Sequence, residues 1–151
     1  MLLLLPALCA GLVEVNRLSK PALQMEARLI WATNNEPPSG FKCTPLDAQS
    51  RESFYNFCRW TNYYLITSKV FSLNDDPQRL QMSERCLIKV RRVEGGKVSL
   101  RLYGENQLVS RTVASLTARG RIITGGPAEN GGGWFISLRP LIAETGPDIP
   151  E

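Results

Sequence analysis

Apolar and polar side chains alternate along most of the chain between residues 25 and 139. In the stretch 86–92, Cys86, Ile88 and Val90 fall on one side of an extended backbone, whereas basic residues fall on the other. Such a period of two is typical of strands with one buried face and one wet face. The pattern predicts about eight short strands, over residues 25–33, 60–67, 69–73 (a separate strand or a continuation), 78–82, 86–93, 97–103, 107–114, 121–124 and 134–139.

Near residues 45–58 the pattern changes to that of one short helix. Thr44 is suited to cap this helix, Pro45 to fill its first position, and Asp47 to bond the free amides of its first turn. No strand–helix–strand rhythm is present. The chain therefore predicts an all-β, mainly antiparallel β-sandwich, formed by a single domain over residues 25–139, with a squat barrel as the alternative.

Two runs of residues resemble ligand sites but fit turns better. Asp75 and Asp76 form the one close pair of carboxylates in the sequence. Asn74 and Pro77 flank them, and this combination of residue types is typical of a turn. The glycine-rich run 125–133 lacks the following helix of a phosphate-binding loop, so we interpret it as a hairpin connection.

The chain starts with an uncharged apolar run over residues 1–13. This run is too short to span a bilayer, which takes about 20 apolar residues, and it fits the apolar core of a secretory signal. The first basic residue is Arg17, so a buried N-terminal strand or helix is the alternative. We expect residues 1–20 to be a signal peptide or N-terminal extension and residues 140–151 to be a flexible tail. The expected location is periplasmic or extracellular, with no membrane span after signal cleavage.

Four cysteines and the absence of histidine narrow the chemistry. An oxidising compartment permits a disulfide between Cys43 and Cys58, which bracket the predicted helix, and Cys86 fits a buried free thiol. Without histidine the chain cannot form a Ser-His-Asp or Cys-His catalytic site. It also lacks a Cys-x-x-Cys pair of the kind that binds zinc. We expect no catalytic residue, no metal site and no cofactor.

Basic residues gather in one part of the chain, although the formal net charge is only +4. Residues 85–121 hold nine basic and two acidic residues. If the strands at 86–93 and 97–103 pair as a hairpin, their basic side chains share an outer surface. This candidate binding face consists of Lys89, Arg91, Arg101 and Arg111. It suits a polyanion, and the alternative is a solvated sheet face whose arginines discourage edge pairing.

Aromatic residues are also concentrated, since seven of the twelve lie between residues 54 and 71. A helix packed on a sheet buries such residues, and we favour this interpretation over an exposed row that stacks on sugars. Tyr63 and Tyr64 are adjacent in a predicted strand. They should therefore point to opposite faces, so that one of them is buried.

Five short segments follow one another within residues 26–139. They are Arg28–Asn34, Trp60–Tyr64, Met82–Cys86, Gly125–Gly126 and Trp134–Leu138. In this order they resemble a group of small, signal-bearing bacterial proteins of uncharacterised function. The segments are strand and turn motifs, so the resemblance implies export and a β-rich fold. It implies no activity, ligand or active residue.

Taken together, these patterns favour an exported, non-enzymatic structural or interaction protein of the cell envelope or the extracellular space. A carbohydrate- or polyanion-binding module is the first alternative. A subunit of an extracellular assembly or filament is the second, and it requires an exposed, uncharged edge strand. An enzyme without histidine is the third. The expected partner is another envelope protein, a second copy of the chain or an anionic glycan, and nucleic acid is not expected.

Overall fold

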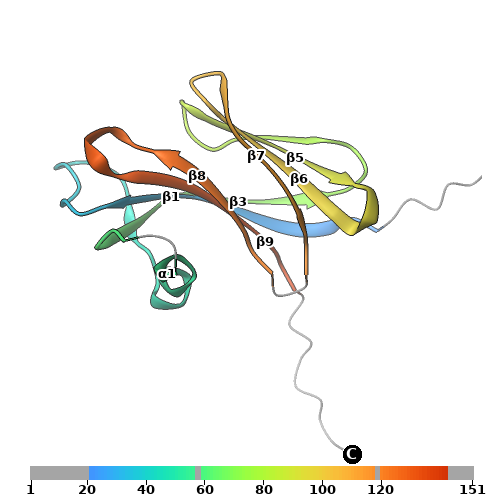
Figure 1. The fold of residues 1–151 in the computed structure, drawn as a ribbon, viewed down its shortest axis with the longest axis horizontal. Coiled ribbons are helices and arrows are strands. Elements are labelled where there is room, and N and C mark those ends of the chain that lie inside the picture. Colours follow the sequence, from blue (N-terminus) through green and yellow to red (C-terminus); the bar gives the residue numbers. More distant parts are fainter. Residues whose placement is uncertain (1–20, 57–58, 118–119, 143–151) are drawn as a thin grey trace, which may run out of the picture.

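The computed structural model describes residues 21–56, 59–117 and 120–142. These residues form nine strands and one α-helix, arranged as two antiparallel sheets that pack against each other (Figure 1). The predicted β-sandwich with one short helix is therefore confirmed. Residues 1–20 and most of the tail expected at 140–151 lie outside the described residues. Within the described ranges, no helix has the length and apolarity needed to cross a membrane.

The larger sheet is built around β1 (Leu23–Thr33). This strand pairs on one side with β3 (Asn62–Leu73) and on the other with β9 (Gly133–Pro140), so it is the central strand. The two edges are β2 (Thr44–Pro45) and β8 (Ile122–Pro127), which gives the order β2-β3-β1-β9-β8.

The smaller sheet is a meander of four strands in chain order. They are β4 (Gln78–Gln81), β5 (Cys86–Val93), β6 (Lys97–Gly104) and β7 (Gln107–Ser115). Glu105 and Asn106 join β6 to β7, and their φ angles of 50° and 66° are the left-handed values that a type I′ hairpin turn requires. Hairpin turns of this kind fix the register of neighbouring strands, and the register decides which side chains share a face.

The main core lies between the two sheets. Met25, Ala27 and Leu29, which alternate along β1, point toward the smaller sheet and are at most 6% exposed. They pack with aliphatic residues of β5, β6 and β9, which are Ile88, Val90, Val98, Leu100, Leu102, Ile136 and Leu138. A large aliphatic side chain contributes about 1.5–3 kcal/mol when it is fully removed from water. This layer therefore holds the two sheets together.

A second, smaller core lies on the opposite face of the larger sheet, beneath helix α1 (Ala48–Tyr55) (Figure 1). Ile30 of β1 packs there with Phe54 and Tyr63, whose rings are 5.3 Å apart. Both aromatic side chains are buried, whereas Tyr64 points to the other face and is half-buried. Core packing of these aromatic residues is therefore confirmed, and β1 is covered on both faces.

The helix begins later than the sequence predicts, because Thr44 and Pro45 form β2. They pair with two residues of β3, and a proline is tolerated at this place because β2 is an edge strand. Asp47 is the N-cap, since its Oδ1 accepts a hydrogen bond from the Ser50 N–H at 2.8 Å. The prediction of Thr44 as the cap was therefore wrong.

The structure also tests the predictions for the strands at 60–73 and for the turn that follows them. The strands predicted at 60–67 and 69–73 are one strand, β3, which carries a bulge facing Leu29 and Ile30. The turn predicted at Asn74–Pro77 is confirmed, because the Asn74 Oδ1 accepts a hydrogen bond from the Asp76 N–H at 2.9 Å.

The glycine-rich run connects the antiparallel strands β8 and β9, as predicted, but the connection is shorter than the whole run, because Gly125 and Gly126 belong to β8 and Gly133 to β9. A Cβ atom at Gly125 would lie 2.2 Å from the backbone oxygen of Trp134. Only glycine therefore allows β8 to approach β9 this closely. The connection that remains is short and includes Gly131, whose φ angle is +78°.

Candidate functional site

Four basic residues form a row across the outer face of the smaller sheet, which we call the basic row. Arg79 of β4 lies directly opposite Lys89 of β5. Lys89 lies opposite Arg101 of β6, and Arg101 lies opposite Arg111 of β7. Neighbouring strands are roughly 4.8 Å apart, so the row extends about 14 Å across the sheet.

The alternation of side chains along each strand turns the basic row outward. Ile88 and Val90, on either side of Lys89, are fully buried in the main core. Leu100 and Leu102, on either side of Arg101, are buried in the same way. Because successive residues of a strand point to opposite faces, burial of the aliphatic side chains places the cations on the surface.

The structure brings together three of the four residues that the sequence offered as a binding face. Lys89, Arg101 and Arg111 belong to the basic row, whereas Arg91 lies on the same face of β5 but opposite Ser99. Sequence reasoning missed Arg79. Arg79 lies in a predicted strand just before β5, and the short connection between these two strands indicates that they pair. The sequence does not show which residue of β5 lies opposite Arg79.

The basic row is not neutralised by any described carboxylate. Arg79, Arg101 and Arg111 are exposed, and no ion pair within 4.0 Å joins them to the described acidic residues. Lys89 is half-buried, and its Nζ lies 5.0 Å from the centre of the Tyr103 ring, a cation–π contact. Like charges directly opposite each other destabilise a sheet. A bound anion would relieve this repulsion.

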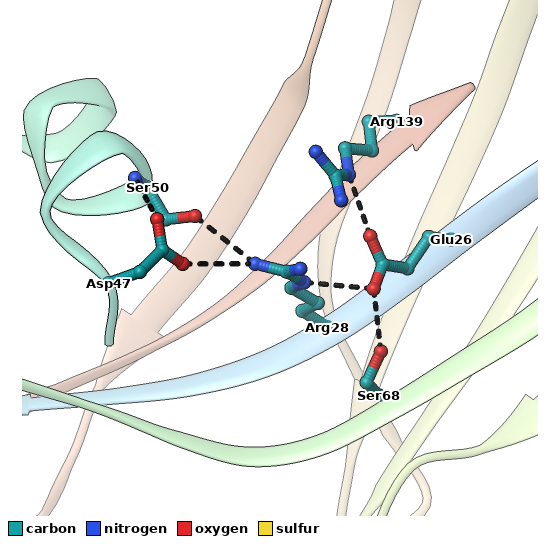
Figure 2. Close-up of polar contacts among 6 residues, drawn as sticks. All are labelled: Glu26, Arg28, Asp47, Ser50, Ser68 and Arg139. Carbon is teal, nitrogen blue, oxygen red and sulfur yellow. Dashed lines mark hydrogen bonds and ion pairs between the residues drawn. The ribbon is translucent and has the colours of Figure 1, made fainter. Parts of the chain in front are cut away.

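A second group of charged residues lies on the outer face of the larger sheet (Figure 2). Glu26 of β1, with a side chain 11% exposed, accepts hydrogen bonds from the Arg28 Nε at 3.0 Å and the Arg139 Nε at 2.6 Å. The Ser68 Oγ donates a third at 2.8 Å. Burial alone raises the pKa of Glu26, but these hydrogen bonds outweigh it and hold the pKa below its usual value.

Arg28 links this group to the start of helix α1. Its Nη1 donates to the Ser50 Oγ at 3.1 Å and lies 3.6 Å from the Asp47 Oδ2 (Figure 2). Hydrogen bonds from Ser50 lower the pKa of Asp47. Every oxygen of the two carboxylates is engaged, so we interpret the group as a structural tie between β1, β3, β9 and α1.

Arg121 lies beside this tie without joining it. Burial lowers the pKa of its guanidinium, and the positive charges of Arg139 and Arg28 lower it further. Its Nη1 forms no hydrogen bond with the part of the chain that the structure describes. The region therefore holds three guanidinium groups and two carboxylates, which adds to the positive balance of the protein.

The thiol of Cys86 offers little reactivity. Cys86 is buried, and burial raises the pKa of its thiol to about 11, so the nucleophilic thiolate is scarce at neutral pH. Cys43 is half-buried, and both are free thiols among the described residues. Cys58 lies outside the described residues, so its pairing with Cys43 stays a prediction. In the described ranges, no cluster of three or more cysteine, aspartate or glutamate side chains is arranged to hold a metal ion.

Comparison of the chain with models of protein families, with curated proteins and with solved structures finds no match. No relative therefore suggests a ligand or a reaction. A functional proposal must therefore be based on the chain's own residues. Among these, the basic row brings the largest number of like charges together.

Proposed function

We propose that this protein is a non-enzymatic binding protein that recognises an anionic polysaccharide outside the cytoplasm through the basic row. The in-register alignment of Arg79, Lys89, Arg101 and Arg111 on four adjacent strands supports this proposal most directly. The apolar N-terminal run supports a location outside the cytoplasm.

The shape of the basic row favours a polymer over a small anion. Two unit charges roughly 5 Å apart in water repel each other by about 0.8 kcal/mol, so the row stores repulsion that a series of negative charges removes. A polymer that crosses the strands meets a cation at each one, whereas a small anion is too short to reach from β4 to β7. Arg79, Arg101 and Arg111 are exposed, so a polymer can reach them from the solvent.

Features of the same face favour a glycan over single-stranded nucleic acid. Proteins that bind single strands stack successive bases on several aromatic side chains. On the outer face of the four described strands Tyr103 is the only aromatic residue, and Lys89 already contacts it. Recognition here therefore depends on charge, which suits sulfate or carboxylate groups on a sugar chain.

The edge strand β7 is poorly suited to pair with a strand of a second subunit, as a filament of this protein would require. Leu108, Val109 and Val113 are exposed on this strand, but Arg111 stands between them. The register with β6 shifts at Val109, which marks a bulge. A charge and a bulge are two devices that discourage pairing of edge strands.

The charged groups also support a binding role rather than catalysis. A general acid at neutral pH needs a raised pKa, whereas the pKa values of Glu26 and Asp47 are lowered. Both carboxylates are held by hydrogen bonds within the chain.

Titration calorimetry with purified full-length protein tests the proposal. We expect binding of heparin and of polygalacturonate, which carry sulfate and carboxylate groups, and no binding of neutral dextran. The double substitution Arg101→Gln and Arg111→Gln should weaken binding about tenfold, because each exposed ion pair contributes about 0.2–1 kcal/mol. The matched control replaces Lys42 and Arg59, two exposed cations away from the row, by glutamine.

Two results would contradict the proposal. Equal losses in the row variant and in the control would show that net charge, rather than the row, is responsible. Tighter binding of single-stranded DNA or of phosphatidylserine vesicles than of either glycan would assign the row to another polyanion.

A further inference from the structure

A cleft of about 600 Å³ opens at the end of the sandwich where the hairpins β6–β7 and β8–β9 lie. Its volume falls within the roughly 300–1,000 Å³ range of small-molecule sites. Trp31 of β1 and Trp134 of β9 are directly opposite each other in the sheet and both line it. Phe41, from the connection between β1 and β2, adds a third aromatic side chain. The site is separate from the basic row.

The lining changes from apolar to charged between the bottom and the mouth. Leu29 and Cys86 are 6% and 4% exposed, so they form a dry bottom. Trp31 and Trp134 are half-buried and form the walls. The charged side chains of the lining are those of Arg85, Glu105 and Glu129, and all three are exposed at the mouth.

The aromatic walls are held in place by the surrounding structure. The Trp134 Nε1 donates a hydrogen bond to the backbone oxygen of Pro127 at 3.0 Å. The Trp31 ring lies 5.4 Å from Phe41 in an edge-to-face contact and 5.8 Å from Tyr64. A binding site with fixed walls loses little freedom when a ligand enters, which favours affinity.

The charges at the mouth leave one carboxylate unpaired. Arg85 and Glu105 form an ion pair at 3.6 Å. Glu129 has no ion pair within 4.0 Å among the residues that the structure describes. The mouth is therefore negative by one charge, although the whole protein is positive.

We infer that the cleft binds a small molecule with an apolar body and one positively charged end, such as a quaternary or primary ammonium amphiphile. The apolar body would lie against Leu29 and the two tryptophans. The cation would lie between the aromatic walls and Glu129, because tryptophan faces attract cations and a carboxylate adds an ion pair. A lipid headgroup and a free ammonium compound share this chemistry.

The first experiment compares probes that share a dodecyl chain and differ in the head. They are dodecyltrimethylammonium, dodecyl maltoside and dodecyl sulfate, each below its micelle concentration. The Trp60→Phe variant of the full chain leaves Trp31 and Trp134 as its tryptophans, and both line the cleft. We expect the ammonium probe to change their fluorescence at the lowest concentration. Titration with choline alone would then separate a free ammonium compound from a chain-bearing lipid.

Two pairs of variants locate the site and its charge preference. Glu129→Gln should weaken binding of the ammonium probe about threefold to fivefold, as expected for one exposed ion pair, and leave the maltoside probe unchanged. The control Glu94→Gln removes a negative charge from the turn between β5 and β6. Phe41→Ala should weaken both probes, whereas the control Tyr55→Ala removes an aromatic side chain that is 59% exposed on α1.

Several results would overturn the inference. Equal affinity for the three heads would mean that the cleft is an apolar surface without a preference for cations. Absence of binding by every probe would show that the cleft is not a site for ammonium amphiphiles. An equal effect of Glu94→Gln and Glu129→Gln would place the ammonium group elsewhere.

Discussion

Arg101 of β6 lies directly opposite Arg111 of β7 on the open face of the smaller sheet. No described carboxylate lies within 4.0 Å of either side chain. Cross-strand pairs of this kind are destabilising in the absence of a counter-charge. The basic row therefore lowers the stability of the free protein, and under the proposed function it supplies the affinity for a polyanion.

Replacement of Arg101 by glutamate should separate these two effects. Arg101→Glu places one negative charge between Lys89 and Arg111. We expect the free energy of unfolding to increase by about 0.5–1 kcal/mol at low salt, whereas affinity for heparin should fall. Urea denaturation at two ionic strengths measures the first effect, which salt should screen. Destabilisation by this variant, compared with Lys42→Glu as a control, would contradict the described register.

Glu26 should make the stability of the protein depend on pH. The pKa of Glu26 is lower in the folded chain than in an unfolded one. Its contribution is therefore fully present above the ordinary pKa of a glutamate and is lost as the pH falls through the lowered folded pKa. Glu26→Gln should decrease the free energy of unfolding by about 3 kcal/mol at pH 7. It should also flatten the acid limb of the stability–pH curve, as measured by urea denaturation. An unchanged acid limb would show that Glu26 is not held by Arg28 and Arg139.

The capping residue of α1 can be tested with two alanine variants. Asp47→Ala removes the acceptor of the Ser50 N–H and the partner of Arg28, and should destabilise the protein by about 1 kcal/mol. Thr44→Ala should have a much smaller effect, because Thr44 is exposed in β2. Thermal unfolding followed by circular dichroism compares the two variants. A larger loss of stability in Thr44→Ala than in Asp47→Ala would show that Thr44, as the sequence predicts, is the cap.

The close contact between β8 and β9 predicts a strong effect at one glycine. Gly125→Ala puts a methyl group where the Trp134 backbone oxygen would be 2.2 Å away, so the two strands must separate. We expect a loss of about 3 kcal/mol or more in chemical denaturation. Gly131→Ala is the control, since its Cβ meets nothing within 4 Å and only its φ angle of +78° is unfavourable. A loss of about 1 kcal/mol is expected there.

Local patterns in the sequence were sufficient to predict the fold class. The alternation of Cys86, Ile88 and Val90 placed β5, and the same reasoning placed β6 and β7 within two residues of their observed bounds. Thr44 was misassigned because threonine suits both an N-cap and a strand. The choice between them depends on pairing with β3, which is a tertiary contact.

The candidate sites depended more on contacts between distant residues. Lys89, Arg101 and Arg111 could be placed on one face because each follows from the alternation of its own strand. The bond between Glu26 and Arg139 joins residues 113 positions apart. Trp31 and Trp134 are also far apart in the sequence, and the pairing of β1 with β9 brings them together. No pattern within one segment contains this information.

The salt dependence of heparin binding tests the role of the basic row most directly. Each cation that contacts a polyanion releases counterions, so the slope of log affinity against log salt reflects the number of contacts. We predict that Arg79→Gln and Arg101→Gln each make this slope shallower, whereas Lys42→Gln leaves it unchanged. If the slope is the same in the wild-type protein and in both row variants, the basic row is not the binding surface.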